Sequence, residues 1–351
     1  MNIANIRQLS QQLAVPQYAE PHEVVRWFGF MQAQDYRMMR WAVAMRTRRP
    51  SIRAFARDYD EGRILRTHLF RCTWQLVCAE DLRWMLQLCK DKNLTSVKGW
   101  MKQYGHSMPT NEETERAFEA IRSILQGRQD VTSEELTLRM IERGINGDSH
   151  QLKIYLYLAE FEGIICSGIL HPQKMTYALT EERIPQFSMP TRDEALALLA
   201  RRYFQSHAPA TMDDFAWWTG LPKGELRRAT ESLGDELMAE TIDGQTYYLM
   251  ASSRMRGCRA MTILLPSFDE YLIGYKTRHH VLDDDFRHRA FTNNGIFHPV
   301  ILSAGKVVGN WHPQSHEVSF FRPEWETDTS ALFAHFENSI KKYGYKKNNG
   351  V

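Results

Sequence analysis

Two glutamines spaced two residues apart are the residues in this sequence best placed to do chemistry. Gln32 and Gln34 lie in the stretch from Phe30 to Arg37, at a break between two helical patterns. In a helix their side chains would point to nearly opposite faces, whereas in an extended segment residues i and i+2 share a face. We therefore predict a non-helical joint at Gln32–Gln34 that presents both amides together. The alternative is that this polar joint only connects two helices.

The elements on either side of the joint would position these amides. Apolar residues recur at helical spacing over 24–31 and again over 38–45, which predicts a helix on each side. On the second helix, Arg37, Arg40 and Arg48 fall within one angular sector opposite the apolar stripe. Because a helix N-terminus also favours anions, this face is predicted to seek an anion. It could equally be a solvated face.

The charge distribution points the same way. The formal net charge of the 351 residues is only +2, but residues 1–78 hold twelve Arg, no Lys and six Asp or Glu, an excess of six positive charges. The rest of the chain must then carry −4. An all-arginine basic segment suits phosphate contact, because guanidinium binds phosphate oxygens bidentately. Acidic neighbours elsewhere in the fold could also balance it.

Several classes of protein are excluded by what the sequence lacks. The composition, with 43% hydrophobic and 25% charged residues, is typical of a soluble globular protein of two or three domains. No apolar run approaches a membrane span, and no signal peptide is apparent. There is no phosphate-binding glycine loop, and the histidines show no convincing ligand spacing, so neither a cofactor nor a metal is predicted. The odd cysteine count without a CxxC pair favours reduced, mostly buried thiols in the cytoplasm; these are Cys72, Cys78, Cys89, Cys166 and Cys258.

One plan of helices followed by a hairpin recurs along the chain. Residues 1–78 are predicted to form helices and then two strands, which is the winged-helix arrangement. Residues 79–180 are predicted to hold a helical insertion and a second copy, and residues 181–257 a third copy that ends in a strong hairpin signal. Residues 258–351 turn to β-structure with a closing helix. In the third copy a recognition helix would carry its basic residues at Lys223, Arg227 and Arg228, although a solvated helix face is as plausible.

An aspartate in the last domain is another candidate for catalysis. Asp269 follows an apolar strand, in the sequence Ser267-Phe268-Asp269-Glu270-Tyr271. A carboxylate at the end of a strand can serve as an acid or a base. A helix cap or a buried ion pair is the favoured interpretation.

Together these motifs resemble the AlkZ/YcaQ-like winged-helix DNA glycosylases, in the expected order and over nearly the whole chain. The matching stretches are Gln32-Ala33-Gln34-Asp35, a wing strand over Arg71–Val77, a signature over Leu264–Tyr275 with Arg278, and a terminal hairpin over Gly295–Trp311. The resemblance implies an α+β fold, in which three tandem winged-helix units are held in a C-shape by a small β-barrel-like domain. It also implies a Gln-Φ-Gln motif, filled here by Gln32 and Gln34, that serves hydrolysis of alkylated or crosslinked purine nucleotides.

This reading assigns roles to individual residues. Gln32 and Gln34 would orient a water, and Asp35 is a second candidate, as a carboxylate that stabilises the cation. The predicted partner is double-stranded, damaged DNA. The protein is predicted to act as a monomer in the cytoplasm, associated with the nucleoid when it binds DNA, and to make no contact with a membrane. The predicted DNA contacts are Arg37, Arg40, Arg46, Arg48, Arg49, Arg71, Thr73 and Gln75, together with Lys223, Arg227 and Arg228.

One departure from the family pattern leaves other functions open. The wing strand usually reads Arg-Gly-Thr-Leu-His, whereas Cys72, Trp74 and Gln75 stand here, so an imidazole contact is missing. A glycosylase-like scaffold without activity is therefore one alternative. A DNA-binding regulator that uses tandem winged helices without chemistry is the other, although the sequence has no obvious ligand domain or dimerisation helix.

Overall fold

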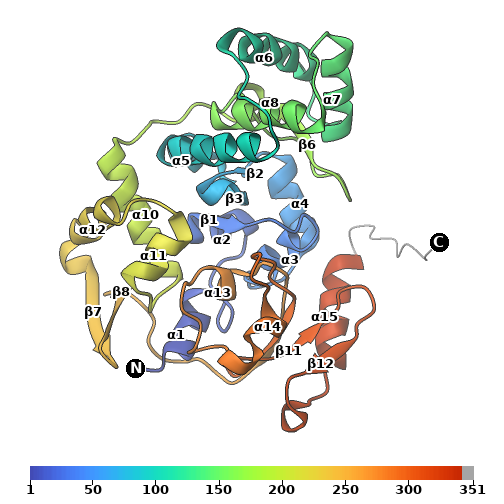
Figure 1. Ribbon diagram of the computed structural model, residues 1–351. Coiled ribbons are helices and arrows are strands. Elements are labelled where there is room, and N and C mark those ends of the chain that lie inside the picture. The colour runs from blue at the N-terminus through green and yellow to red at the C-terminus, as the bar shows by residue number, and fades with distance from the viewer. Residues whose placement is uncertain (342–351) are drawn as a thin grey trace.

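The computed structural model describes residues 1–341, so the predicted end of the closing helix lies outside the described residues. The chain begins with helices α1 and α2, a short strand, two more helices and a hairpin (Figure 1). Strand β1 pairs with β3, which pairs with β2, and all the pairings are antiparallel. The bounds are α1 Ile3–Ser10, α2 Pro21–Phe28, β1 Phe30–Gln32, α3 Met39–Ala44, α4 Ile52–Asp60, β2 Ile64–His68 and β3 Trp74–Cys78.

The predicted non-helical joint is confirmed: the chain leaves α2 for a short strand, β1, which ends at Gln32, and Gln34 lies in a bend two residues beyond it. Helix α2 begins in a capping box between Glu20 and Glu23 and ends at Gly29, whose φ of +86° turns the chain out of the helix. The next three residues pair with β3, with Gln32 opposite Gln75. The two glutamines therefore start from the edge of a three-stranded sheet.

The second part of the chain repeats helices and a small sheet. Two long helices come first, and they lie at the top of Figure 1 with α7 and α8. A second sheet has the order β4-β6-β5, so here too a short strand precedes the hairpin. The bounds are α5 Leu82–Gln103, α6 Asn111–Leu125, β4 Val131–Thr132, α7 Ser133–Glu142, α8 Ser149–Phe161, β5 Ile165–Ser167, β6 Thr176–Leu179 and α9 Thr180–Arg183.

The third part also has helices followed by a hairpin, but its sheet has two strands, and in place of the short strand Ala210 forms an isolated bridge to Tyr248. A capping box between Thr191 and Glu194 opens α10, another between Thr211 and Asp214 opens α11, and Gly220 ends α11 in the left-handed conformation. The bounds are α10 Arg192–Ser206, α11 Met212–Thr219, α12 Lys223–Glu231, β7 Leu237–Ile242 and β8 Gln245–Met250. The predicted helices and hairpin of this part are confirmed.

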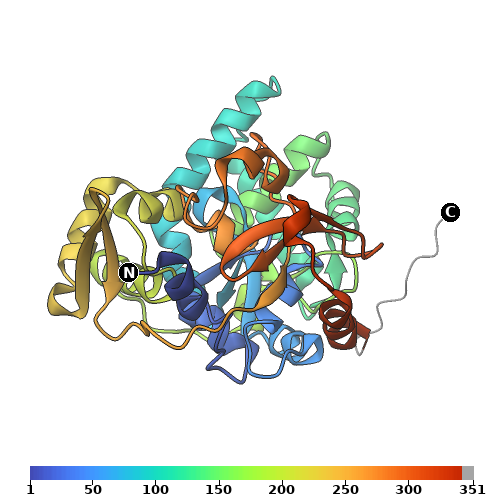
Figure 2. The same ribbon diagram turned by 90° about the horizontal axis from the view of Figure 1, so that it is seen from below.

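The last part contains an open sheet and not a closed barrel, which corrects the barrel-like expectation. Its strand order is β12-β11-β10-β9, and among the described residues the outer strands β9 and β12 each pair on one side only. Helix α15 packs against this sheet, as Figure 2 shows. The bounds are β9 Thr262–Leu265, α13 Glu270–Ile273, α14 Arg287–Ala290, β10 Val300–Ser303, β11 Lys306–Trp311, β12 Val318–Phe320 and α15 Ser330–Lys341.

Two buried contacts join these parts around β1. The ring of Phe30 stacks on Trp218 of α11, with centroids 3.7 Å apart, and on Phe70. The Arg46 guanidinium binds both carboxylate oxygens of Asp269 at 2.8 and 2.9 Å, and both side chains are fully buried. Asp269 also caps α13 through Tyr271 N, so the favoured interpretation of this aspartate is confirmed. Strand β1, which ends at Gln32, is thus held by α11, and the segment after α3 is held by the residue before α13.

Two further expectations can be compared with the structure. The cysteines are free, and four of them are buried, as the sequence predicted. Within residues 1–341, every helix is too short or too polar to traverse a lipid bilayer.

Candidate active site

The two predicted amides lie at the end of β1: Gln32 is its last residue, and Gln34 follows in a bend. The Gln32 side chain is buried, and its Oε1 accepts a hydrogen bond from Thr73 Oγ1 at 3.3 Å and a long one from Gln75 Nε2 at 3.5 Å. The Gln34 side chain is exposed, and its Oε1 accepts from Trp74 N at 3.4 Å. Both amide oxygens therefore face residues 73–75, one from within the protein and one at its surface.

The backbone between the two glutamines is clamped by charged side chains. Gln32 N donates to Glu270 Oε1 at 2.5 Å, and Ala33 O accepts from Arg66 Nε and Nη2, both at 3.0 Å. Ala33 N donates to Trp74 O at 2.8 Å. All of these partners come from other elements, so the Gln-Ala-Gln segment is fixed before any ligand arrives. Such preorganisation is what a site needs if it works by positioning.

Glu270 is itself held by buried donors. Its Oε2 accepts from Trp218 Nε1 at 3.1 Å and lies 3.2 Å from His207 Nε2. Burial lowers the pKa of His207, and the neighbouring Glu270 only partly offsets this effect. The His207 imidazole beside the carboxylate is therefore neutral and does not form an ion pair with it. Glu270 remains free to accept the hydrogen bond from Gln32 N that anchors this residue.

We predict that Glu270→Gln lowers the free energy of unfolding by about 1–3 kcal/mol, because an amide offers one acceptor where the carboxylate serves several donors. It should also slow any reaction that depends on Gln32. Urea unfolding measures the first effect. Glu162→Gln, which breaks an exposed pair with Lys90, is the matched control and should change stability by less than about 1 kcal/mol. Equal stability of the two variants would contradict the anchoring role.

The turn between β2 and β3 has a conformation that L-residues rarely adopt. Arg71 and Cys72 have φ values of +60° and +53°. Asn93 of α5 holds the turn, since its Oδ1 accepts from Cys72 N and its Nδ2 donates to Leu69 O. Packing around this turn therefore imposes on Cys72 a conformation that glycine would adopt freely.

The structure contradicts a direct DNA contact by Gln75. Its side chain is fully buried, its Oε1 accepts from Phe70 N, and its Nε2 donates to Phe70 O. It therefore stabilises the turn from inside. Thr73, which is half-buried, contacts Gln32 instead of pointing away from the protein. Trp74, also half-buried, stacks between His68 at 3.7 Å and the Arg66 guanidinium at 3.9 Å.

Asp35 lies beside the pair but has structural partners. Its Oδ1 accepts from Arg37 N at 2.9 Å and Met38 N at 3.0 Å, and its Oδ2 accepts from Ser267 Oγ at 2.6 Å. The carboxylate therefore caps the turn into α3 and ties it to the last part of the chain. Its suggested part in catalysis stays a prediction.

The predicted arginine face is wrong in part. Helix α3 covers only residues 39–44, so Arg37 and Arg48 lie outside it. Arg40 is buried and donates to His171 O and Pro172 O, and Arg46 is buried in its pair with Asp269. Neither guanidinium can reach a phosphate, because each is enclosed by protein. The other predicted arginines of this region, Arg37, Arg48 and Arg49, are exposed.

The basic residues predicted on α12 are also exposed. Lys223 Nζ donates to Asp213 at 2.5 Å, and Arg227 and Arg228 project from the same helix. Figure 1 places α12 at the edge of the molecule, away from β1. The basic residues of α12 and the two glutamines therefore form two separate sites of possible DNA contact.

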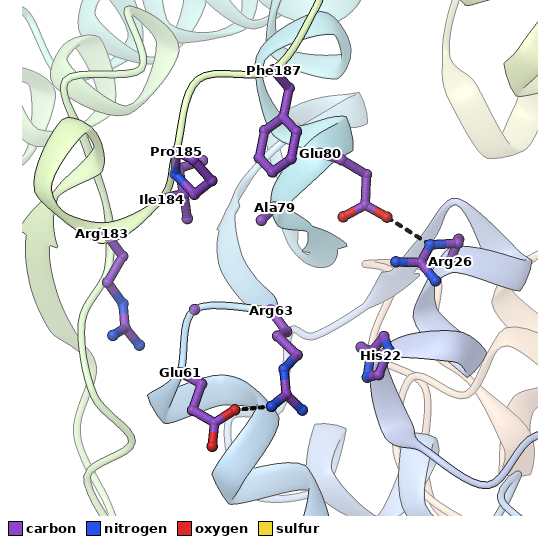
Figure 3. Close-up of a pocket in the computed structure, with 11 residues that line it drawn as sticks. His22, Arg26, Glu61, Arg63, Ala79, Glu80, Arg183, Ile184, Pro185 and Phe187 are labelled. Atoms are coloured by element: carbon purple, nitrogen blue, oxygen red, sulfur yellow. Dashed lines mark hydrogen bonds and ion pairs between the residues drawn. The ribbon is translucent and has the colours of Figure 1, made fainter.

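A pocket of about 250 Å³ lies elsewhere, where α2, the turn after α4, the segment between β3 and α5, and the segment after α9 meet. Figure 3 shows its charged side chains paired within the protein: Arg26 with Glu80, and Arg63 with Glu61. His22 Nδ1 lies 2.8 Å from Asp58 Oδ2. None of the predicted site residues lines this pocket, and its charges already have partners. It is a poor candidate for the reaction.

Sequence reasoning missed the residues that hold the glutamines. Glu270 follows Asp269, the candidate in the sequence motif, but was not itself predicted to have a role. Nothing in the sequence distinguishes Arg66 from the other arginines of residues 1–78. Their partners are far away in sequence, with Glu270 238 residues from Gln32. A signal existed only in the motif around Asp269, whose two consecutive acids follow a buried strand.

Comparisons with known proteins show the family and the fold of this chain. The chain belongs to the AlkZ-like DNA glycosylase family, because that family's model, described as DNA glycosylase AlkZ-like, matches residues 25–343. Among solved structures it is similar to the Streptomyces sahachiroi DNA glycosylase AlkZ, with a TM-score of 0.76 and 22% identity over 97% of this chain and 96% of that one. At that identity the likeness concerns the fold. A search of curated proteins found no significant match.

Proposed function

We propose that this protein is a monofunctional DNA glycosylase that hydrolyses the N-glycosidic bond of alkylated or crosslinked purine nucleotides. The observation that carries the proposal is that the amide oxygens of Gln32 and Gln34 both accept hydrogen bonds from residues 73–75, while Glu270 and Arg66 hold the backbone of this segment. Membership of a DNA glycosylase family supports the reaction class.

The chemistry suits amides if the leaving group is already good. Glycoside hydrolysis passes through an oxocarbenium-like transition state and ordinarily uses carboxylates. A glutamine cannot usefully accept a proton, but its carbonyl can orient a water while its NH₂ donates elsewhere. A purine alkylated at N7 is cationic and departs without a general acid, so positioning and electrostatics can supply the rate. Selectivity then comes from the lability of the damaged base.

The two glutamines differ in exposure, and this difference assigns their roles. Gln34, at the surface, orients the attacking water. Gln32, which is buried and bonded to Thr73, holds the end of β1 against the turn before β3. Asp35 adds negative charge near the developing cation, while its oxygens stay bonded to Ser267 and the backbone.

The surrounding surface supplies the contacts to DNA. We propose that the three helix-and-hairpin parts are winged helices, with residues 1–78, 79–180, 181–257 and 258–351 as the domains. The protein acts as a monomer on damaged double-stranded DNA, in the cytoplasm and at the nucleoid. The contacts are the accessible members of the predicted set: Arg37, Arg48, Arg49, Arg71, Thr73, Lys223, Arg227 and Arg228.

The experiment is release of free base by the wild-type protein from three duplexes of one sequence: unmodified, carrying N7-methylguanine, and carrying an N7-linked interstrand crosslink. Released base is identified by chromatography, and abasic sites by alkali-labile strand breaks. We expect release from at least one damaged duplex and none from the unmodified one. Breaks that form before alkali treatment would contradict the monofunctional assignment.

Silence on both damaged duplexes would overturn the proposal. Sequence-specific binding to undamaged DNA would then favour a regulator that reads base edges with α12. Tight binding to damaged DNA without base release would instead indicate a glycosylase scaffold that has lost activity.

A further inference from the structure

Two arginines near the glutamine pair flank an exposed indole. The Arg71 guanidinium carbon lies 5.7 Å from the centre of the Trp217 ring, and that of Arg278 lies 5.6 Å from it. Trp217 is 41% exposed, yet its Nε1 donates to Ile273 O at 3.1 Å, so the ring is fixed in place. The three residues come from the turn before β3, from α11 and from the segment after α13. We refer to them as the Arg71–Trp217–Arg278 cluster.

Both guanidiniums have unused donors inside the protein. Arg71 Nε and Arg278 Nη2 are buried, and neither has a hydrogen-bond partner among the described residues. Among the described residues, Arg278 donates to the carbonyls of Leu272 and Lys276 and lies over the rings of Phe291 and Phe297, and no carboxylate forms an ion pair with it. A buried donor without an acceptor costs free energy, and native proteins usually satisfy one with a water, an ion or a ligand.

The nearest carboxylates are committed to other donors. Glu270 accepts from Gln32 N and Trp218 Nε1. Asp214 accepts from the backbone nitrogens of Thr211, Lys276 and Thr277. Neither forms an ion pair with Arg71 or Arg278 within the described part of the chain.

The electrostatics of the cluster favour an anion. Burial lowers the pKa of Arg278 to about 10; Asp214 opposes this, while the like charges of Arg287 and Arg71 add to it. Burial likewise lowers the pKa of Arg71, which Glu270 only partly offsets. Like charges held together in a desolvated place are relieved by a bound anion.

We propose that the Arg71–Trp217–Arg278 cluster binds a backbone phosphate of the substrate DNA strand beside the glutamine pair. Arg71 lies two residues before Thr73, which contacts Gln32. The turn before β3 therefore connects the cluster to the glutamine pair. A fixed and partly exposed indole suits contact with the sugar or base next to that phosphate. The inference rests on the proposed function, and it adds Trp217 and Arg278 to the expected DNA contacts.

The test measures binding of a labelled undamaged duplex by fluorescence anisotropy at several salt concentrations. Arg71→Gln and Arg278→Gln should each weaken binding roughly tenfold and reduce the slope of log Kd against log salt by about 1. Trp217→Leu should weaken binding at an unchanged slope, because no charge is lost. Arg278→Lys should keep the wild-type slope.

The matched control is Arg122→Gln, which removes one exposed positive charge from α6, far from the cluster in Figure 1. It should leave affinity and slope unchanged within about twofold. Far-UV circular dichroism and thermal unfolding verify that each variant is folded. Folded Arg71→Gln and Arg278→Gln proteins with the wild-type slope would overturn the inference, whether or not their affinity changes.

The two proposals can fail separately. Undamaged DNA undergoes no reaction, so the salt slopes are independent of the chemistry at Gln32 and Gln34. Normal base release with unchanged slopes would refute only the phosphate site. Cluster-dependent slopes in a protein that never releases a base would refute only the glycosylase assignment.

Discussion

Replacing Gln34 with alanine is expected to slow base release about 10²- to 10³-fold, the usual effect of removing one preorganised polar group from an active site. The side chain is exposed, and the hydrogen bond that its Oε1 accepts from Trp74 N is long, at 3.4 Å. Its loss should therefore cost the fold little. The rate falls because the attacking water loses the carbonyl that orients it.

Single-turnover release from the N7-methylguanine duplex measures this effect. Gln186→Ala is the matched control, because Gln186 is an exposed glutamine in the segment after α9, outside the site. It should release base at the wild-type rate. A folded Gln34→Ala protein that also stays within threefold of wild type would show that Gln34 does not take part.

Replacing Asp269 with alanine is expected to lower the free energy of unfolding by about 3–5 kcal/mol, the usual cost of leaving one buried charge without its partner. Arg46 would keep its bonds to Ala42 O and Gln11 O, but its charge would be uncompensated. The cap of α13, the helix that begins with Glu270, would also be lost. We therefore expect base release to fall as well.

Urea unfolding with an unchanged m-value gives the stability change. The exposed pair of Arg201 and Glu236 supplies the control, since Glu236→Ala should cost less than about 1 kcal/mol. The double variant Arg46→Ala with Asp269→Ala should cost less than the sum of the two single variants. Additive losses would mean that the pair is not coupled.

Much of the fold could be predicted because its signals are local. Thr191, Thr211 and Glu20 begin helices through hydrogen bonds within four residues, and Asp243-Gly244 turns the β7–β8 hairpin. The closure of a sheet is not local. Whether β9 meets β12 depends on strand length, twist and what covers each edge, so the expected barrel was wrong.

The candidate site could be predicted only in part, for the same reason. The non-helical joint at Gln32–Gln34 could be predicted, because it lies at a break between two helical patterns in the sequence. By contrast, Arg40 and Arg46 look like phosphate ligands in the sequence, and only the partners His171 and Asp269 explain their burial. Arginine at a helix face serves a buried carbonyl or a phosphate equally well, so the distinction requires the tertiary structure.

The central claim is that the two amides act on bound DNA and do not merely help to bind it. The most direct test is the double variant Gln32→Ala with Gln34→Ala, assayed on the N7-methylguanine duplex with saturating enzyme. We predict a folded protein that binds this duplex within about threefold of wild type and releases N7-methylguanine no faster than the spontaneous reaction. Release at the wild-type rate by the folded double variant would contradict the account.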